Sequence, residues 1–230
     1  NVVSMPSQQR HFNYDGFLTA PSNQTPIAIA EQYLRTNAGN LGMLASDVNN
    51  YLVTRNYVTQ ETGATSLTFQ QTLNGLPVRN ANFNITVMPN GQLLSVMGGF
   101  VSGLSTRANQ FTTVPSVSAQ SSLNAASAYL KLTNGALSGV QSETINGKLT
   151  LTAPSISKDK IVPTLEYVST GGNGVALAWN LRLRTLDGQN WYTASVDALS
   201  GKMVSLGNYF SHASYEAIAV PGTDPEDTPR

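Results

Sequence analysis

The side chains that most often carry out chemistry are scarce in this chain. Among 230 residues there are 2 His and Cys 0. The two histidines, His11 and His212, stand near opposite ends of the chain, and no His-x-x-x-His spacing could hold a zinc ion from one helix. Without cysteine there is no thiolate ligand and no thiol nucleophile. Metal-dependent and thiol chemistry are therefore not expected within this chain.

Motifs for nucleophilic and phosphate chemistry are also missing. The sequence contains no G-x-S-x-G elbow and no G-x-x-x-x-G-K-[ST] loop. The glycines of Gly171-Gly172-Asn173-Gly174 lie between two predicted strands, so we interpret them as a turn. Several of the 13 acidic residues stand beside turn residues, and Asp197, near a strand end, could face a partner. The residue types favour a binding protein over an enzyme.

Composition narrows the kind of partner. Charged residues make up 11% of the chain, against about 25% in typical soluble domains. Polarity comes instead from 23 Ser, 23 Thr and 21 Asn. A formal net charge of +0 gives no basic field for nucleic acid, and no apolar run approaches the about 20 residues of a membrane span. The N-x-[ST] sequons at Asn23 and Asn84 are candidate glycosylation sites and fit a secreted protein.

The pattern of apolar residues predicts an α+β fold. Thr25-Pro26 is a helix start, followed by apolar residues at helical spacing, and strands with period two follow from Tyr51 to Phe100. A second helix begins at Ser116 or Ser118, and an Asn146-Gly147 turn and further strands follow it up to Phe210. Both halves therefore have the order helix, then antiparallel sheet.

The same pattern predicts the organisation of the chain. We expect two similar domains separated by a linker, with an irregular arm before them and an extended, acidic, proline-rich tail after them. The predicted boundaries are an arm at 1–24, a first domain at 25–101, a linker at 102–115, a second domain at 116–212 and a tail at 213–230. Trp179 lies on the apolar face of its strand and is expected in the core, whereas the position of Trp191 at the start of a strand is left open.

One segment resembles a known family. Phe69-Gln70-Gln71 followed by Asn74-Gly75-Leu76-Pro77-Val78 is similar to the F-x-Q…N-G-[IL]-P-V pattern in the prosegment of fungalysin- and thermolysin-type zinc metallopeptidases. Trp179-Asn180-Leu181 and the stretch 196–201 resemble the final strands of the PepSY-like module that follows in that prosegment. The resemblance implies two cystatin-like subdomains, each a helix packed on an antiparallel sheet.

The start of the tail resembles the beginning of a mature fungalysin enzyme. Ala213-Ser214-Tyr215-Glu216 carries this similarity, which implies a processing junction between His212 and Ala213. The His-Glu-x-x-His catalytic domain of the family is missing from the sequence. The resemblance therefore implies a secreted, non-catalytic prosegment whose partner is the cognate catalytic domain. The zinc ion would belong to that partner.

Such prosegments are implied to assist folding of the enzyme and to hold it inactive. We expect four residues, Tyr209, Phe210, Ser211 and His212, to lie in the partner's substrate cleft, with His212 either ligating the partner's zinc or filling a subsite. Two alternatives stay open. One is a free-standing inhibitor built from the same modules, and the other is a surface adhesion or glycan-binding module, for which the Asn, Ser and Thr content would be suited.

Overall fold

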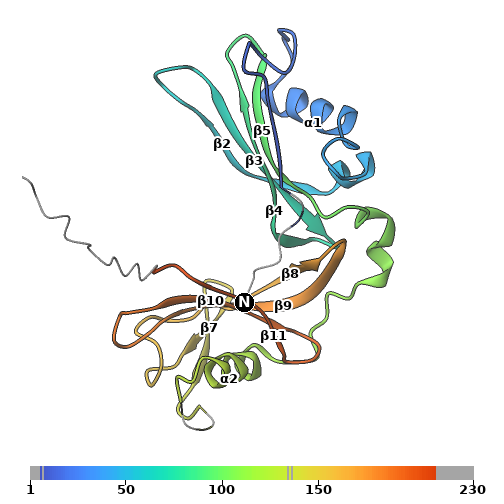
Figure 1. Ribbon diagram of the computed structural model, residues 1–230. Coiled ribbons are helices and arrows are strands. Elements are labelled where there is room, and N and C mark those ends of the chain that lie inside the picture. The colour runs from blue at the N-terminus through green and yellow to red at the C-terminus, as the bar shows by residue number, and fades with distance from the viewer. Residues whose placement is uncertain (1–5, 7, 134, 136, 211–230) are drawn as a thin grey trace, which may run out of the picture.

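The computed structural model describes residues 6, 8–133, 135 and 137–210. The chain forms two helix-on-sheet halves, one above the other in Figure 1, here called the first half (up to residue 101) and the second half (from residue 116). Their elements, in chain order, are β1 (Gln9–Phe12), α1 (Pro26–Thr36), η1 (Ala45–Asn49), β2 (Tyr51–Val58), β3 (Thr65–Leu73), β4 (Leu76–Val87), β5 (Leu93–Gly99), η2 (Ser105–Gln110), α2 (Ala119–Tyr129), β6 (Gln141–Ile145), β7 (Lys148–Thr152), β8 (Thr164–Gly171), β9 (Gly174–Arg184), β10 (Trp191–Asp197) and β11 (Met203–Asn208).

In the first half, α1 packs on a five-stranded antiparallel sheet of order β2-β3-β4-β5-β1. The hydroxyl of Thr25 accepts a hydrogen bond from the N–H of Ala28 at 3.3 Å, which confirms the predicted helix start. Ala30 and Leu34 of α1 are fully buried. On β3, burial alternates along the strand, and its buried Leu67 and Phe69 lie in one cluster with the buried residues of α1.

In the second half, α2 packs on an antiparallel sheet of order β8-β9-β10-β11. Ser118 caps α2, and its hydroxyl accepts from the N–H of Ser121 at 3.1 Å. Strands β6 and β7 form a separate hairpin. The predicted turn at Asn146 and Gly147 is confirmed, because both residues have positive φ (51° and 73°), as a type I′ turn requires. The α+β class with a helix on each antiparallel sheet is thus confirmed.

Strand β4 connects the two halves. Its later residues pair with β5, while Val78 and Arg79 near its start pair with Tyr167 and Val168 of β8 in parallel. A hydrophobic cluster lies at this joint and takes residues from both halves. Its buried members are Leu73, Val78, Ala81, Val101, Leu104, Tyr167, Leu177 and Ala198. The halves therefore share one continuous sheet as well as part of their core.

Two segments that the sequence predicted to be irregular contain regular structure. The arm at 1–24 holds β1, which pairs with β5, and the linker at 102–115 holds η2. β1 has 4 residues and η2 has 6, which is too few for apolar periodicity to reveal them, and the strand that pairs with β1 is distant in sequence. The last strand, β11, ends at Asn208 rather than Phe210. The tail at 213–230 lies outside the described residues, and the predicted domain boundaries stay a prediction.

Candidate protein-binding site

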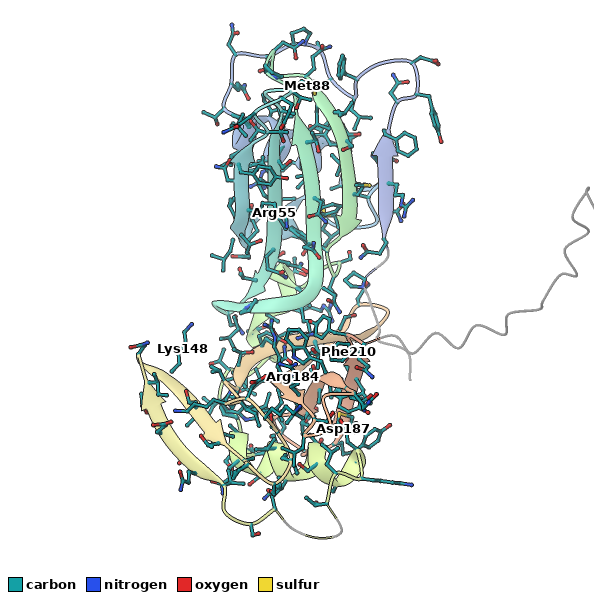
Figure 2. The ribbon with its side chains drawn as sticks, turned by 90° about the vertical axis from the view of Figure 1, so that its left-hand side faces the viewer. Arg55, Met88, Lys148, Arg184, Asp187 and Phe210 are labelled. Atoms are coloured by element: carbon teal, nitrogen blue, oxygen red, sulfur yellow. The ribbon has the colours of Figure 1, made fainter. Side chains whose placement is uncertain are left out.

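The end of β11 carries the described part of the predicted cleft-binding segment. Tyr209 and Phe210 follow the strand directly, and their side chains are 60% and 39% exposed. Ser211, His212 and Ala213 lie outside the described residues, so the structure places only the first two of the four predicted residues. Phe210 is labelled in Figure 2, in the second half, close to the level at which the two halves meet. Two aromatic side chains are therefore available to a partner beside the joint.

Neighbouring residues fix the backbone where the chain leaves β11. The side-chain oxygen of Asn208 accepts hydrogen bonds from the N–H groups of Trp191 and Phe210, both at 3.1 Å. The N–H of Tyr209 donates to the carbonyl of Trp191 at 2.9 Å. The rings of Trp191 and Tyr209 lie 5.3 Å apart between centroids. The backbone at Tyr209 and Phe210 is thus held by contacts with Asn208 and with the start of β10.

A pocket of about 320 Å³ lies beside Tyr209. It is bounded by the joint on one side and the end of β11 on the other, with Arg79, Asn80, Thr193, Ser205, Gly207, Asn208 and Tyr209 as its lining. Arg79 forms an ion pair with Glu166 at 2.9 Å, and both side chains are largely buried. The pocket offers polar groups and one aromatic ring, a combination suited to a peptide backbone with side chains.

Burial has the largest effect on the pKa of Glu166. It raises this pKa above its ordinary value, while the positive charges of Arg79 and Arg182 lower it. The ion pair therefore only partly offsets the loss of solvation that Glu166 suffers at the joint. A carboxyl held in this way responds to pH and to any partner that changes its exposure.

The backbone around Arg79 is held by Gln70, a residue of the motif that resembles the prosegment pattern. The side-chain amide of Gln70 donates hydrogen bonds to the carbonyls of Val78 and Ala81, the second at 3.0 Å. These carbonyls flank Arg79 and Asn80, and Asn80 has a left-handed φ of 61°. Gln70 thus supports an irregularity of β4 that turns the strand from β5 toward β8.

Two further motif residues organise the joint from the first half. The amide of Gln71, itself 1% exposed, donates to the carbonyl of Val101 and accepts from its N–H, at 2.9 and 2.8 Å. The amide of Asn74 donates to the carbonyls of Ala108 and Phe111, both at 2.9 Å. The motif therefore holds both the exit from β5 and the segment around η2.

The second half holds the end of that connecting segment and the entry to α2. The hydroxyl of Tyr167 donates to the carbonyl of Thr112 at 2.7 Å, and the indole N–H of Trp179 donates to the carbonyl of Val117 at 2.8 Å. Trp179 packs against both the joint cluster and the core under α2, which confirms its predicted place in the core. Trp191, whose place was left open, is 43% exposed.

Sequence analysis missed the Arg79–Glu166 pair and found the exposed end of β11 only through the resemblance. The two ion-pair partners are 87 positions apart, so no local spacing could have revealed them. The sequon residues Asn23 and Asn84 are both exposed and belong to the first half. Asn84 stands within β4, and its side-chain oxygen accepts from the hydroxyl of Thr68 at 2.9 Å.

No three His, Asp or Glu side chains in the described part of the chain gather as a metal site would require. No helix in that part combines the length and the apolar character needed to cross a membrane.

Comparison with known proteins identifies the region that contains the motif. Residues 49–100 match the Fungalysin/Thermolysin Propeptide Motif. The chain is 29% identical over 188 residues to extracellular metalloproteinase 10 of Coccidioides posadasii, covering 78% of this chain and 28% of that protein. It is 26% identical over 234 residues to the extracellular metalloproteinase MEP of Neosartorya fischeri, covering 100% of this chain and 36% of that protein.

These matches confirm the resemblance seen in the sequence. The chain carries the propeptide motif and is homologous to fungal extracellular metalloproteinases, and it spans about a third of the length of these relatives. A solved structure, the YpeB C-terminal domain of Bacillus megaterium, aligns with 86% of this chain and 70% of its own at 9% identity and a TM-score of 0.33. That likeness is too remote to bear on fold or function.

Proposed function

We propose that this chain is the non-catalytic prosegment of a secreted fungalysin-type zinc metalloprotease, and that it inhibits the catalytic domain and assists its folding. The observation that carries the proposal is the propeptide motif at 49–100, supported by homology to extracellular metalloproteinases. The partner is the cognate catalytic domain, which would supply the zinc ion. In the precursor, cleavage between His212 and Ala213 would end the latent state.

The geometry at the end of β11 supports the inhibitory part of the proposal. Hydrogen bonds fix the backbone through Phe210, and Tyr209 and Phe210 present exposed rings. A segment held in one direction loses little conformational entropy when it enters a cleft, and its affinity rises accordingly. Residues 209–212 would then occupy the cleft like a cleaved product and exclude substrate.

The folding role follows from the same binding. A partner that binds only the folded protease stabilises that state by mass action, and covalent linkage in the precursor raises the effective concentration of the partner. The neutral polar surface, rich in Ser, Thr and Asn, is suited to a broad hydrogen-bonded interface. Glycosylation at the exposed Asn23 and Asn84 would be compatible with secretion.

Inhibition of the cognate catalytic domain is the direct test. We expect a chain ending at His212 to inhibit with the potency of the full chain, and a chain ending at Asn208 to lose at least about tenfold, because cleft contacts of an exposed aromatic pair typically contribute more than 1 kcal/mol. The full-length double variant Tyr209→Ser, Phe210→Ser should show the same loss without truncation. Undiminished potency of both altered chains, at unchanged thermal stability, would contradict the cleft-binding role.

The role of His212 needs a separate measurement. A catalytic domain loaded with cobalt in place of zinc reports direct ligation, because a new nitrogen ligand changes its visible spectrum. If His212 ligates the metal, the wild-type chain changes the spectrum and the His212→Ala chain does not. If both chains leave the spectrum unchanged while His212→Ala weakens inhibition, His212 fills a subsite instead.

The folding role and the nearest alternative are separable. Denatured catalytic domain should regain more activity when refolded with this chain, followed by proteolytic removal of the chain, than when refolded alone. An equal yield would contradict the folding role.

A second observation tests the alternative of a free-standing inhibitor. That alternative is favoured if the coding sequence does not continue past Arg230 into a His-Glu-x-x-His domain.

A further inference from the structure

A second pocket on the second half is strongly basic. It has a volume of about 440 Å³ and lies between the β6–β7 hairpin, the loop before β8 and one face of β9. Its lining consists of Lys148, Asp159, Lys160, Val162, Thr164, Asn180, Arg182, Arg184 and Trp191, which together we call the basic groove. Four of the 13 basic residues of the chain therefore meet here with a single carboxylate. Figure 2 shows Lys148 on the hairpin and Arg184 over the sheet.

Strand alternation places the two arginines in the groove. Leu181 and Leu183 are fully buried in the core under α2. Arg182 and Arg184 alternate with them on β9 and must point to the opposite face of the sheet. Arg184 pairs in register with Trp191 of β10, so the indole stands beside this guanidinium.

The cations of the groove are weakly neutralised within the described part of the chain. Lys160 contacts Glu143 at 2.6 Å and Arg184 contacts Asp159 at 4.0 Å, but all four side chains are between 46% and 63% exposed. Exposed pairs of this kind contribute little stability. Lys148 and Arg182 form no salt bridge with any described residue. The groove thus retains positive charge that a ligand could neutralise.

A buried amide at the base of the groove points to a ligand independently of the charge. Asn180 lines the groove and is 4% exposed. Its side-chain oxygen is buried and accepts no hydrogen bond from the described residues. A buried acceptor without a donor is costly, and the N–H of a bound peptide would satisfy it. Cations for carboxylates and an acceptor for a peptide N–H together indicate an acidic polypeptide as the ligand.

The sequence supplies one such segment. Residues 1–210 contain twelve of the basic and nine of the acidic residues, whereas 211–230 contain one basic and four acidic residues, Glu216, Asp224, Glu226 and Asp227. The neutral chain is therefore the sum of a positive body and a negative C-terminal segment. We propose that the basic groove binds the acidic segment 213–230 of this chain.

The position of Tyr209 makes this binding geometrically accessible. Tyr209 contacts Trp191, and Trp191 is part of the groove wall. Glu216 follows Phe210 by six residues and Asp224 by fourteen, so an extended chain reaches about 20 Å and about 50 Å from that point. The binding extends the proposed function by anchoring the chain on both sides of the predicted junction at His212 and Ala213. Its test nevertheless requires no protease.

Zero-length crosslinking of the full chain tests the proposal. A carbodiimide joins a lysine amine to a carboxylate only where the two are in contact. We expect Lys148 and Lys160 to be joined to carboxylates of 216–227 within one molecule, as mapped by mass spectrometry. Lys131 and Lys202, which lie outside the groove, should not be joined to that segment. Raising the ionic strength to about 1 M, where the Debye length is about 3 Å, should abolish the crosslinks.

A matched pair of variants separates the groove from a general charge effect. Arg182→Ser with Arg184→Ser should lower the crosslinked fraction about tenfold, if each arginine–carboxylate pair contributes a factor of about three. Arg10→Ser with Arg55→Ser removes the same charge from the first half and should leave that fraction unchanged. Equal crosslinking of all lysines, crosslinks only between molecules, or no effect of the groove variant would each overturn the proposal. Loss of protease inhibition with intact crosslinks would contradict only the proposed function.

Discussion

The two halves share an order of elements but satisfy their buried polar groups very differently. In the first half the carboxylate of Asp47, itself 1% exposed, accepts from the N–H groups of Leu44 and Gly103 at 3.0 and 2.8 Å and from the hydroxyl of Ser105 at 3.2 Å. All seven buried side-chain oxygens that lack a partner among the described residues lie in the second half. They belong to Ser122, Asn124, Ser127, Ser169, Asn180, Thr193 and Ser195.

The core of the first half also contains more aromatic packing than the core of the second half. The first half packs aromatic pairs, Tyr51 on Phe69 at 4.3 Å and Phe83 on Phe100 at 4.9 Å between ring centroids. The second half relies on an alanine-rich helix, α2, whose buried face includes two serines. Each unsatisfied buried group costs about 1–3 kcal/mol. We infer that the first half is the stable framework and that the second half keeps polar groups available for a partner.

The largest expected effect is the loss of stability when one core residue is truncated in each half. Phe83→Ala should lower the free energy of unfolding by about 3–5 kcal/mol and Leu123→Ala by about 2–5 kcal/mol. Because Phe83 lies on β4, which joins both halves, its loss should reduce amide protection throughout the chain. Loss of Leu123 should reduce protection of β8–β11 and leave β3 and β4 protected. Hydrogen exchange with mass spectrometry measures both patterns, and identical patterns would remove the distinction between the halves.

Replacing a buried polar side chain by an apolar one should change the free energy of unfolding differently in the two halves. Gln71→Leu leaves both backbone groups of Val101 without their partners and should cost about 2–5 kcal/mol. Ser195→Ala removes a fully buried hydroxyl that has no described partner and should be neutral or stabilising by up to about 1 kcal/mol. Urea denaturation of the two variants gives the comparison. A loss of similar size in both would show that the polar groups of the second half are as well satisfied as those of the first.

Features with local signals were predictable from the sequence. Thr25-Pro26 marked a helix start, and Asn146-Gly147 marked a hairpin, since each depends on the conformational preferences of adjacent residues. Strand β1 was missed because four residues of mixed polarity carry no period, and its place depends on backbone pairing with β5. The ordering of 102–115 was missed because side chains from elsewhere in the chain, Asn74 and Tyr167, donate the hydrogen bonds that hold it.

The candidate sites were predictable only in part. The segment from Tyr209 was singled out through its resemblance to a known prosegment, and its role in binding stays a prediction. The ion pair of Arg79 with Glu166 spans the joint, so it could be found only once the halves were placed together. Sequence analysis did not single out Arg182 and Arg184, although they alternate with the buried Leu181 and Leu183 on β9. Their convergence with Lys148 and Lys160 depends on a hairpin whose position the sequence does not encode locally.

Two similar turns, one in each half, should differ by an intermediate amount in the stability lost when their asparagine is replaced. Asn74 and Asn146 both have left-handed φ, 50° and 51°, and each is followed by glycine. Only Asn74 also donates two hydrogen bonds, which hold the segment around η2. Replacement by Ala should cost about 1–2 kcal/mol of backbone strain at either turn and about 1–2 kcal/mol more at Asn74. Thermal unfolding measures the difference, and equal shifts would show that the Asn74 bonds add no stability.

The smallest expected effect lies at the joint and depends on pH. Burial raises the pKa of Glu166 in the folded protein above its ordinary value of 4.5, against the opposing charges of Arg79 and Arg182. A carboxyl with a raised pKa binds its proton more tightly when folded. Its contribution to stability is therefore complete below about pH 4.5 and is lost as the pH rises through the folded-state pKa. Glu166→Gln should remove this decline, so the unfolding free energy of the variant should rise relative to that of the wild type as the pH rises through that window.

The exposed pair of Arg35 with Glu31 in the first half, 2.7 Å apart, is the control. Glu31→Gln should leave the decline in place, and urea denaturation at several pH values compares the three chains. A decline that persists in Glu166→Gln would place the pH response outside the joint and make the two halves equivalent in this respect.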